Sequence, residues 1–468
     1  MKQAVDVAVI GAGHAGLNAI KEIRGATDSW VLINGGPLGT TCARIGCMPS
    51  KIAKHLAETY QSKDRLLRYG VRGSEHLAID KEEAMEYVRD LRDTFVDLVL
   101  ANTTDEMDAE HLIEGYAELL DAHRIRVGDR EIQANSIVIA TGARSVVPAE
   151  WEPEFGDSIL TVDNLFDQAR LPESVAVIGL GPIGIEIAQA LRRLDIQVTG
   201  LDHGQFVARI SDPDVNQAAI EILGREFPMW LGHEPQIRRA AGGGYSVRSG
   251  DREALVEKVF FAIGRPPNLE RMRLDRLGVP LWPNGTPQYD PQTLKVWRHP
   301  IYIAGDATGG IANRQRAAKQ GRVAGYNAVH RRPIRYRQHT EIAIIFAEPN
   351  IAAVGRRWDE LDSEQVRGRT AGPPSGSTTR GRGLSSRSSL ESGSGGALIS
   401  RTPGPRACAE DLDIGLHRNA RGRIQRPDGE GLASAVREDR DVLADELVLR
   451  GPYRWLRLSQ SRAWLRPR

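Results

Sequence analysis

The chain has 468 residues, of which 41% are hydrophobic, and a formal net charge of +1 at pH 7. This length predicts two to four domains, and the apolar fraction is sufficient for folded cores. A nearly neutral chain gives no reason to expect nucleic acid or an anionic membrane as a partner. No apolar run approaches the roughly 18–20 residues that cross a bilayer. Three cysteines argue against a secreted disulfide scaffold. Because a strand-like run starts at Val5, no room is left for a signal peptide, and we expect a cytoplasmic protein.

Strand and helix signals alternate over roughly the first 200 residues, which predicts parallel sheets with crossover helices. Two strand–turn–helix units there share one glycine spacing. The first contains the strand 5–10, the glycines Gly11, Gly13 and Gly16, and the inward-facing helix residues Leu17, Ile20 and Ile23. The second contains the strand 175–178, the glycines Gly179, Gly181 and Gly184, and the inward-facing Ile187, Leu191 and Leu194.

This G-x-G-x-x-G spacing between a strand and a helix is typical of dinucleotide-binding units. The first glycine makes a tight turn, the second lets the backbone approach a pyrophosphate, and the third lets the helix pack on the strand. The N-terminus of the helix then faces the phosphate charge. One such motif is a weak indication, but two of them predict two nucleotide-binding domains.

In such units the residue at the end of the second strand accepts hydrogen bonds from the adenosine ribose. In the second unit this residue is Asp202, whose carboxylate would repel a 2′-phosphate and therefore favours NAD over NADP. In the first unit it is Asn34. An amide can still bind a ribose hydroxyl, but without the strength of a charge-assisted hydrogen bond. We therefore expect looser binding at the first site.

Cys42 and Cys47 lie five residues apart in the segment 39–51. In a regular helix their Cα atoms would be roughly 8 Å apart, which is too far for a disulfide. A bridge needs a distorted turn, which Gly46 and Pro49 are suited to form, and a helix N-terminus nearby would stabilise a thiolate. Two unrelated buried thiols are one alternative. A zinc site is another, but it would need two more soft ligands and only one cysteine remains.

The segment 39–51 closely resembles the active-site segment of class I pyridine nucleotide–disulfide oxidoreductases, which include dihydrolipoyl dehydrogenase, glutathione reductase and mercuric reductase. The resemblance covers about residues 4–355, and further motifs follow in the family's order. They are Ala140-Thr141-Gly142 leaving the FAD domain, Ala262-Ile263-Gly264-Arg265 leaving the NAD domain, Ile303-Ala304-Gly305-Asp306 at the strand end whose aspartate binds the ribityl chain, and Phe346–Ile351 as the first strand of the dimerisation domain. Each motif alone is weak evidence for the family, whereas their joint order and spacing is strong evidence for it.

The resemblance implies FAD and NAD as cofactors, with electrons passing through a Cys42–Cys47 disulfide. It implies that Cys47 faces the flavin as the charge-transfer thiolate and that Cys42 attacks the substrate disulfide. Lys51 would lie near flavin N5, and Glu186 would pair with it. The cofactor-binding residues implied are Gly11, Gly13, Gly16, Asn34, Thr41, Lys51, Thr141, Gly142, Gly179, Gly181, Gly184, Asp202, Gly264 and Asp306. No metal ligand is expected.

The expected fold is α/β, with two Rossmann-like nucleotide-binding domains and a C-terminal α+β dimerisation domain that is degenerate or frameshifted. The domain bounds are 1–145 for the first part of the FAD domain, 146–268 for the NAD domain, 269–338 for the second part of the FAD domain and 339–468 for the dimerisation domain. Residues 51–70 and 81–104 are predicted helices, and 112–140 predicted short strands. The family implies a homodimer.

The expected substrate is a small dithiol or disulfide. NAD favours dihydrolipoyl dehydrogenase, acting on dihydrolipoamide or on a lipoyl group of a carrier domain, over the NADPH-using glutathione reductase. Mercuric reductases carry an additional C-terminal cysteine pair, and this chain ends at Arg468 without one. The sequence is also compatible with an NADH diaphorase or with an inactive remnant.

The composition changes after about Gly355, and residues 356–468 contain 21 arginines but no lysine or phenylalanine. We interpret this change as a break in the reading frame near residues 356–366. Ser, Gly, Arg, Thr and Pro dominate residues 367–406, which predicts disorder. Beyond them only residues 442–458 form a convincing apolar segment.

Two features of the family are missing. Its C-terminal His-Pro-x-x-x-x-Glu-like motif has no counterpart, because His417 lacks the proline and glutamate and His299 belongs to another domain. The helix after Asp306 begins with Asn313 and Arg314, where the family has a histidine- and glutamate-containing approach to the flavin. A positioned general base contributes roughly 10²–10⁴ in rate. We therefore expect slow thiol–disulfide interchange and a weaker dimer, but intact reduction of the flavin by NADH.

Overall fold

A computed structural model of the chain describes residues 2–149, 151, 159–338, 342–354, 357–360 and 397–401. The chain divides into a unit of residues 1–403 and a unit of residues 404–468, and the described residues all lie in the first. The predicted apolar segment 442–458 lies outside the described residues. Among the helices that are described, none has both the length and the apolarity to cross a membrane.

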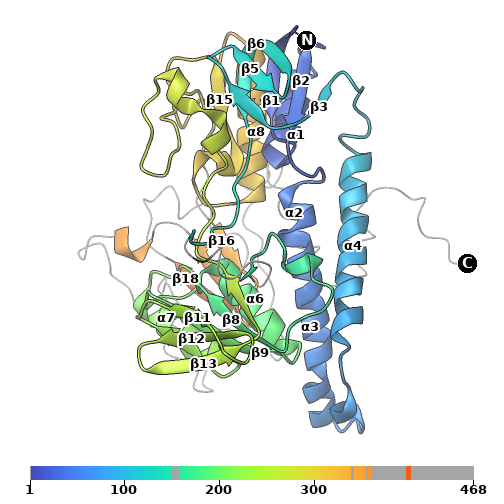
Figure 1. Cartoon of the computed structure of the whole chain (residues 1–468), viewed down its shortest axis with the longest axis vertical. Helices are drawn as coiled ribbons and strands as arrows, with labels where there is room; N and C mark the ends of the chain where they lie inside the picture. The colour runs from blue at the N-terminus through green and yellow to red at the C-terminus, as the bar shows by residue number, and fades with distance from the viewer. Residues whose placement is uncertain are drawn as a thin grey trace, which may run out of the picture. The chain divides into compact units, whose positions relative to one another are not determined.

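The first sheet has seven strands (Figure 1). They are β1 (Lys2–Ile10), β2 (Trp30–Asn34), β3 (Leu112–Glu114), β4 (Ala117–Leu119), β5 (Arg124–Val127), β6 (Arg130–Ile139) and β15 (Ile301–Ile303). β1 lies between β2 and β6 and is parallel to both, and β15 joins the sheet in parallel beside β6. β5 is antiparallel to β6, and β4 to β5. The parallel part is buried because helices cover parallel strands.

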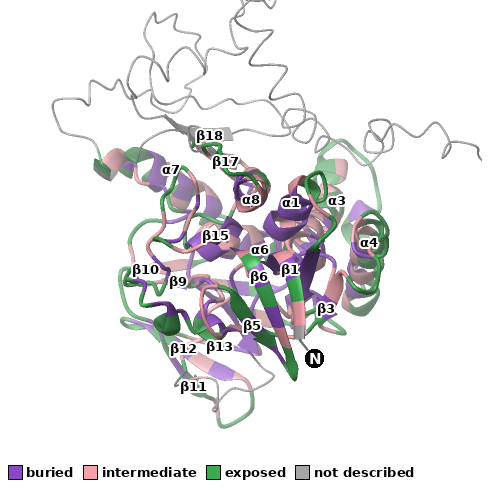
Figure 2. Cartoon of the chain, turned by 90° about the horizontal axis from the view of Figure 1, so that it is seen from above, coloured by how far each residue is buried: buried purple, intermediate pink, exposed green. Residues whose placement is uncertain are grey.

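Helices α1 (His14–Ile23) and α8 (Arg314–Val329) pack closely against each other beside this sheet. α1 is buried over most of its length (Figure 2). The close approach depends on a glycine of α8, since a Cβ at Gly321 would lie 2.1 Å from the carbonyl oxygen of Ala15. No side chain larger than hydrogen fits at this helix crossing.

The second sheet has five strands, all parallel. In spatial order they are β10 (Met229–Leu231), β9 (Gln197–Asp202), β8 (Ser174–Ile178), β14 (Lys258–Phe261) and β7 (Ile159–Leu160). Its helices are α6 (Pro182–Arg193) and α7 (Pro213–Leu223). A small antiparallel sheet of β11 (Gln236–Arg239), β12 (Tyr245–Ser249) and β13 (Arg252–Val256) shares a hydrophobic core with it.

These two sheets confirm the predicted mixed α/β fold. The residues predicted to face inward are all buried, namely Leu17, Ile20, Ile23, Ile187, Leu191 and Leu194. The strands predicted within residues 112–140 are β3 to β6. Single turns of 3₁₀ helix occur at Ser74–His76, Leu165–Asp167, Glu270–Met272, Leu274–Leu277, Gly305–Thr308 and Trp358–Glu360.

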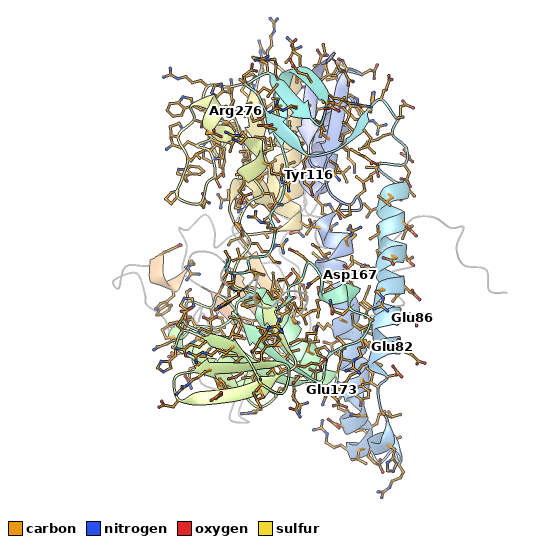
Figure 3. All side chains as sticks on the ribbon, viewed as in Figure 1. Glu82, Glu86, Tyr116, Asp167, Glu173 and Arg276 are labelled. Atoms are coloured by element: carbon orange, nitrogen blue, oxygen red, sulfur yellow. The ribbon has the colours of Figure 1, made fainter. Side chains whose placement is uncertain are left out.

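Two long helices, α3 (Cys47–Arg68) and α4 (Lys81–Ala101), run side by side where residues 51–70 and 81–104 were predicted to be helical (Figure 1). The short α2 (Thr41–Arg44) precedes them. Two ion pairs connect α4 to the segment before β8: Lys81 contacts Glu173 and Arg92 contacts Asp167, each at 2.5 Å. Figure 3 labels the two acidic partners, Glu173 and Asp167. These acidic partners are half exposed or more, so we expect each pair to contribute little stability.

A third sheet contains β16 (Ile342–Ile345), β17 (Asn350–Val354) and β18 (Ala397–Arg401). The strand predicted at Phe346–Ile351 is wrong in position, because β16 ends at Ile345 and residues 346–349 form the turn to the antiparallel β17. Pro349 has no N–H to donate to a strand ladder, which explains the turn. β18 pairs in parallel with β17 and corrects the predicted disorder at residues 397–401. The rest of the stretch 367–406 lies outside the described residues.

Replacing Gly321 by alanine tests the close approach of α1 and α8. In an exposed helix, alanine is more favourable than glycine by about 1 kcal/mol, but here the clash with Ala15 should prevail. We expect Gly321→Ala to lower the free energy of unfolding in urea by roughly 1–3 kcal/mol. An added Cβ at Gly242 meets open space, so Gly242→Ala should change stability by less than about 0.5 kcal/mol. Equal stability of the two variants would contradict this account of the packing.

Candidate functional site

The first glycine motif forms the turn between β1 and α1, and each glycine serves a different purpose. Gly11 has a φ of +108°, and a Cβ there would lie 2.3 Å from the carbonyl oxygen of Ala140. A Cβ at Gly16 would lie 1.8 Å from the carbonyl oxygen of Gly11, so the helix approaches the strand closely. Gly13 instead faces open space and lines a pocket. The backbone is therefore accessible to a ligand at Gly13, as a dinucleotide requires.

The same three purposes recur in the turn between β8 and α6. Gly179 has a φ of +91°, and a Cβ there would lie 2.7 Å from the carbonyl oxygen of Ala262. A Cβ at Gly184 would lie 1.9 Å from the carbonyl oxygen of Gly179, whereas Gly181 faces open space. Two distant parts of the sequence thus fold into equivalent turns for equivalent steric reasons.

The residue at the end of the second strand closes each turn. Asn34 Oδ1 accepts a hydrogen bond from the backbone N–H of Ala12 at 3.1 Å. In the equivalent place, Asp202 Oδ2 accepts one from the N–H of Leu180 at 2.7 Å. The structure thus brings both predicted residues to their glycine turns. Their contacts with a ribose stay predictions.

Cys42 and Cys47 lie on either side of a break between two helices. Cys42 is in α2, and Cys47 is the first residue of α3. Between them the N–H groups of Ile45 and Gly46 both donate to the carbonyl oxygen of Thr41, which ends α2 with a tight turn. This is the distorted turn that the spacing predicts. Both cysteines are free thiols, and the Cys42 side chain is hydrogen-bonded to Cys47.

The hydrogen bond divides the charge unequally between the two thiols. Accepting it lowers the pKa of Cys47 to about 7, with the positive charge of Lys51 assisting and burial opposing. Donating it raises the pKa of Cys42 well above the ordinary value of a thiol, and burial raises it further. As the pH rises through about 7, the reduced pair therefore gains one negative charge, and this charge is on Cys47.

A pocket of about 390 Å³ connects the cysteines with the first glycine turn. The predicted site residues that line it are Gly13, Thr41, Cys42, Cys47, Lys51, Gly142, Glu186 and Asp306. Gly11, Gly16, Asn34, Thr141, Gly179, Gly181, Gly184, Asp202 and Gly264 are not part of its lining. Among residues without a predicted role, it is also lined by His14, Ser50, Asn313, Arg314 and Phe346.

The predicted pairing of Lys51 with Glu186 is not a direct ion pair among the described residues. Glu186 Oε1 instead accepts a hydrogen bond from the backbone N–H of Phe346 at 2.8 Å. Lys51 Nζ lies 4.6 Å from the centre of the Phe346 ring, a cation–π contact. Burial raises the pKa of Glu186, against the opposing effects of that hydrogen bond and of the charge of Lys51. Phe346, in the turn between β16 and β17, thus contacts both groups.

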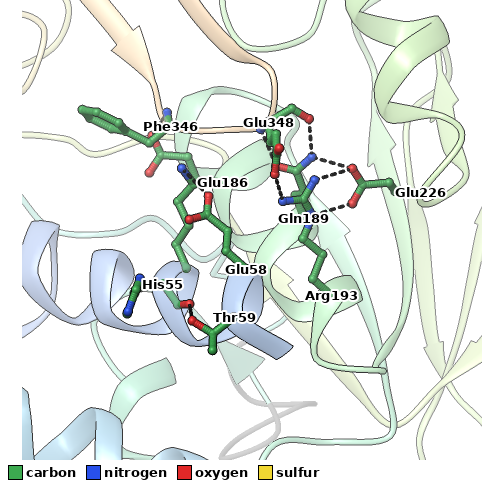
Figure 4. Close-up of polar contacts among 10 residues, drawn as sticks. His55, Glu58, Thr59, Glu186, Gln189, Arg193, Glu226, Phe346 and Glu348 are labelled. Carbon is green, nitrogen blue, oxygen red and sulfur yellow. Dashed lines mark hydrogen bonds and ion pairs between the residues drawn. The ribbon is translucent and has the colours of Figure 1, made fainter. Parts of the chain in front are cut away.

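A partly buried ion network connects this turn to α6 (Figure 4). Gln189 exchanges two hydrogen bonds with the backbone of Glu348, at 2.7 and 2.8 Å. Arg193 contacts the carboxylates of Glu348 at 2.5 Å and of Glu226 at 2.8 Å. Because Arg193 is buried, losing either acid would leave its charge poorly compensated.

The residues around the carboxyl ends of β6 and β15 fit the predicted FAD. Thr141 Oγ1 is buried without a hydrogen-bond partner among the described residues. Gly142, with a φ of +70°, faces open space. Asp306 follows β15, and burial raises its pKa, while Arg265 and Arg316 oppose this. An unpaired hydroxyl, an open backbone position and a carboxyl group are suited to a large polar ligand.

Gly264 follows β14 with a φ of +148° and open space beside it. The neighbouring Arg265 donates hydrogen bonds to the Ser145 hydroxyl at 3.0 Å, the Asp163 carboxylate at 3.1 Å and the Ala143 carbonyl at 2.8 Å. These bonds cross between the two chain segments that leave the sheets. In the described part of the chain, no group of three or more His, Cys, Asp and Glu side chains is suited to a metal ion.

His14 is the functional candidate that the sequence pattern concealed. It is the first residue of α1 and lines the pocket next to Gly13. Burial lowers its pKa to about 4, with the charges of Arg314 and Lys21 adding to the effect. The imidazole is therefore neutral near neutral pH. One feature of the sequence could have predicted this role: His14 lies inside the first glycine motif, and such a motif directs the N-terminus of the helix toward the ligand.

Comparisons with known proteins agree with this arrangement. A sequence profile of the family described as "Pyridine nucleotide-disulphide oxidoreductase" matches residues 5–321. The mercuric reductase of Staphylococcus aureus is 27% identical over 363 residues, which are 75% of this chain and 64% of that protein. A dihydrolipoyl dehydrogenase of Pseudomonas aeruginosa is 26% identical over 365 residues, 74% of this chain and 75% of that protein. The chain therefore spans less than two thirds of the Staphylococcus protein.

Comparison with solved structures also agrees with this arrangement. LpdA from Mycobacterium tuberculosis matches with a TM-score of 0.67 and 26% identity, covering 78% of this chain and 81% of that chain. The HOCl-induced flavoprotein disulfide reductase RclA from Escherichia coli matches with a TM-score of 0.64 and 22% identity, covering 76% of this chain and 78% of that chain. At that identity, the likeness to RclA concerns the fold alone.

Alkylation tests the unequal charge of the cysteine pair. In reduced protein, iodoacetamide should modify Cys47 before Cys42, because only the thiolate is a nucleophile. The rate at Cys47 should rise with pH, reach half its maximum near the pKa of about 7 and then level off. Peptide mass spectrometry after timed alkylation identifies the modified residue. Faster labelling of Cys42 at neutral pH would reverse the assignment.

Proposed function

Because the chain belongs to the pyridine nucleotide-disulphide oxidoreductase family, we propose that its Cys42–Cys47 pair carries electrons between a dithiol or disulfide substrate and NAD. As a member of this family it is a flavoprotein that binds FAD and a pyridine nucleotide. The observation that carries the proposal is the hydrogen-bonded pair of thiols across the break between α2 and α3, in which the pKa of Cys47 is lowered and that of Cys42 is raised. The two thiols line one pocket with Gly13 and Asp306.

In the direction of disulfide reduction, the Cys42 proton passes along the hydrogen bond to Cys47, and the Cys42 thiolate attacks one sulfur of the substrate. The departing sulfur then takes that proton from Cys47. One substrate thiol leaves, and a mixed disulfide remains. The Cys47 thiolate then attacks the Cys42 sulfur, which closes the Cys42–Cys47 disulfide and releases the second thiol after it takes a proton from water. The pair loses two electrons and the substrate gains them. Bound FAD supplies two-electron transfer between the pair and the pyridine nucleotide.

Dihydrolipoamide is the substrate that we favour, on the basis of Asp202. A carboxylate at the second glycine turn disfavours the 2′-phosphate of NADP, and dihydrolipoyl dehydrogenase uses NAD. The lipoyl group of a carrier domain has the same chemistry and is a second form of this substrate. We also propose a homodimer, as in the family. Glutathione disulfide and mercuric ion are the competing substrates, since glutathione and mercuric reductases are among the similar proteins.

Serine variants test the role of the cysteine pair. Cys42→Ser and Cys47→Ser should each lower NADH-dependent lipoamide reduction by a factor of at least about 10³, because the relay needs both sulfurs. Flavin reduction by NADH, followed by rapid-mixing absorbance, should persist in both variants. Cys408→Ser is the control and should retain the original rate.

The same assay separates the competing functions. Lipoamide should give a higher kcat/KM than glutathione disulfide or mercuric ion. Rapid NADH oxidation with a quinone that persists in Cys42→Ser, without turnover of any disulfide, would favour a diaphorase. Purified protein without flavin would indicate an inactive remnant.

Asp202→Asn tests the choice of nucleotide. The carboxylate should repel a 2′-phosphate, whereas asparagine keeps the shape and the hydrogen bond to Leu180, as Asn34 does in the first turn. The preference for NADH over NADPH in kcat/KM should fall roughly tenfold, which corresponds to about 1.4 kcal/mol. Steady-state kinetics with both nucleotides provide the measurement. An unchanged ratio would remove Asp202 from the explanation of specificity.

A further inference from the structure

The start of α8 places an arginine in the pocket of the cysteine pair. Asn313 caps this helix, because its side-chain oxygen accepts a hydrogen bond from the backbone N–H of Arg316 at 3.0 Å. Arg314 is the first residue of the helix, and it lines the same pocket as Cys42 and Cys47. This is the segment where the sequence departs from the family pattern.

Arg314 and Lys51 act on the same thiol from different helices. The pKa of Cys47 is lowered most by the hydrogen bond from Cys42 and is raised by burial. The charge of Lys51, a backbone hydrogen bond and, as the smallest contribution, the charge of the exposed Arg314 lower it further. Both cations also oppose the raised pKa of Cys42. The other titratable or charged side chains that line the pocket are His14, Glu186, Arg265 and Asp306.

Among these, the imidazole is unsuited to deprotonate a thiol. The pKa of His14 is about 4 and that of Cys47 about 7. Proton transfer between them is therefore unfavourable by about a thousandfold. Glu186 accepts a hydrogen bond from Phe346 and is buried, so its carboxyl is already engaged. The negative charge of the reduced pair is therefore stabilised first by the hydrogen bond from Cys42 and, beyond it, by positive charge nearby.

We propose that Arg314 is a fixed positive charge of the dithiol site that, together with Lys51, keeps Cys47 as a thiolate. The inference rests on the proposed function, because it concerns the same cysteine pair. A guanidinium suits this task because it stays protonated throughout the pH range of the enzyme. The N-terminus of α8 adds partial positive charge at the same place. Arg314 is thus a positioning residue that acts through Cys47, and it provides charge where the family has a different helix start.

The pH dependence of Cys47 alkylation tests this proposal. The flavin-loaded enzyme is reduced with dithiothreitol, freed of the reductant and alkylated with iodoacetamide between about pH 5 and about pH 9. Removing a nearby positive charge raises the pKa of a thiol. In Arg314→Gln we therefore expect the midpoint to move to higher pH, with roughly two- to threefold slower alkylation of Cys47 at pH 6, because water screens the charge of the exposed Arg314. Arg314→Lys should restore most of the original profile.

Arg316→Gln is the matched control. Arg316 lies two residues further along α8, and its guanidinium contacts the Thr308 hydroxyl at 3.4 Å. Removing the Arg316 guanidinium should leave the pH midpoint of Cys47 alkylation unchanged. A midpoint unchanged in Arg314→Gln, or shifted equally in Arg316→Gln, overturns the proposal.

Two further comparisons keep the outcome interpretable. If Arg314→Gln loses flavin, Arg314→Lys is compared with Arg314→Met, whose side chain has a similar length but no charge. Equal pH midpoints of Cys47 alkylation in these two variants overturn the proposal. The proposed function fails separately, if the original enzyme does not reduce disulfides with NADH. The alkylation midpoint needs no turnover, so it still reports on Arg314 in that case.

Discussion

The interruption of helical structure at Ile45 and Gly46, between α2 and α3, is the constraint on which the site depends. In an uninterrupted helix, two thiols five residues apart could not touch. The tight turn that ends α2 lets them touch, and it makes Cys47 the first residue of α3. There the unpaired N–H groups of a helix N-terminus favour negative charge. The hydrogen bond from Cys42 then determines which sulfur carries it. A short local distortion thus produces two chemically different thiols from two identical side chains.

The pocket forms because three parallel strands of the first sheet end at the same level. Ile10 of β1 pairs with Ile139 of β6, which in turn pairs with Ile303 of β15. The segments that follow them contribute Gly13, Gly142 and Asp306 to the pocket. Open α/β sheets bind ligands at this edge, since the connections there leave the backbone and the helix starts accessible. Residues almost 300 positions apart in the sequence therefore face one ligand.

Much of this arrangement could be predicted from local sequence. The glycine turns depend on short-range sterics, and the cysteine pair depends on a spacing that only a broken helix can use. The partner of Glu186 could not be predicted in the same way, because it is a backbone N–H from a turn 160 residues later, at Phe346. The sequence predicts a strand at that turn, since an apolar residue before Glu-Pro does not reveal where strand pairing ends. The position of Arg314 in this pocket was also hidden, because it depends on the packing of α8 against α1.

The attachment of the Phe346 turn to α6 has a consequence for communication within the fold. Gln189 and Arg193 hold Glu348, and Phe346 is bonded to Glu186, so the turn is carried by the helix that follows the second glycine motif. The aromatic ring over the Lys51 ammonium is therefore positioned by the nucleotide-binding helix of one sheet, while the ammonium belongs to a helix that starts at the redox pair. A displacement of α6 cannot occur without altering this contact. This ring thus adds a polar contact to the direct packing of α3 on α6, which already joins the helix of the second glycine motif to the helix of the redox pair.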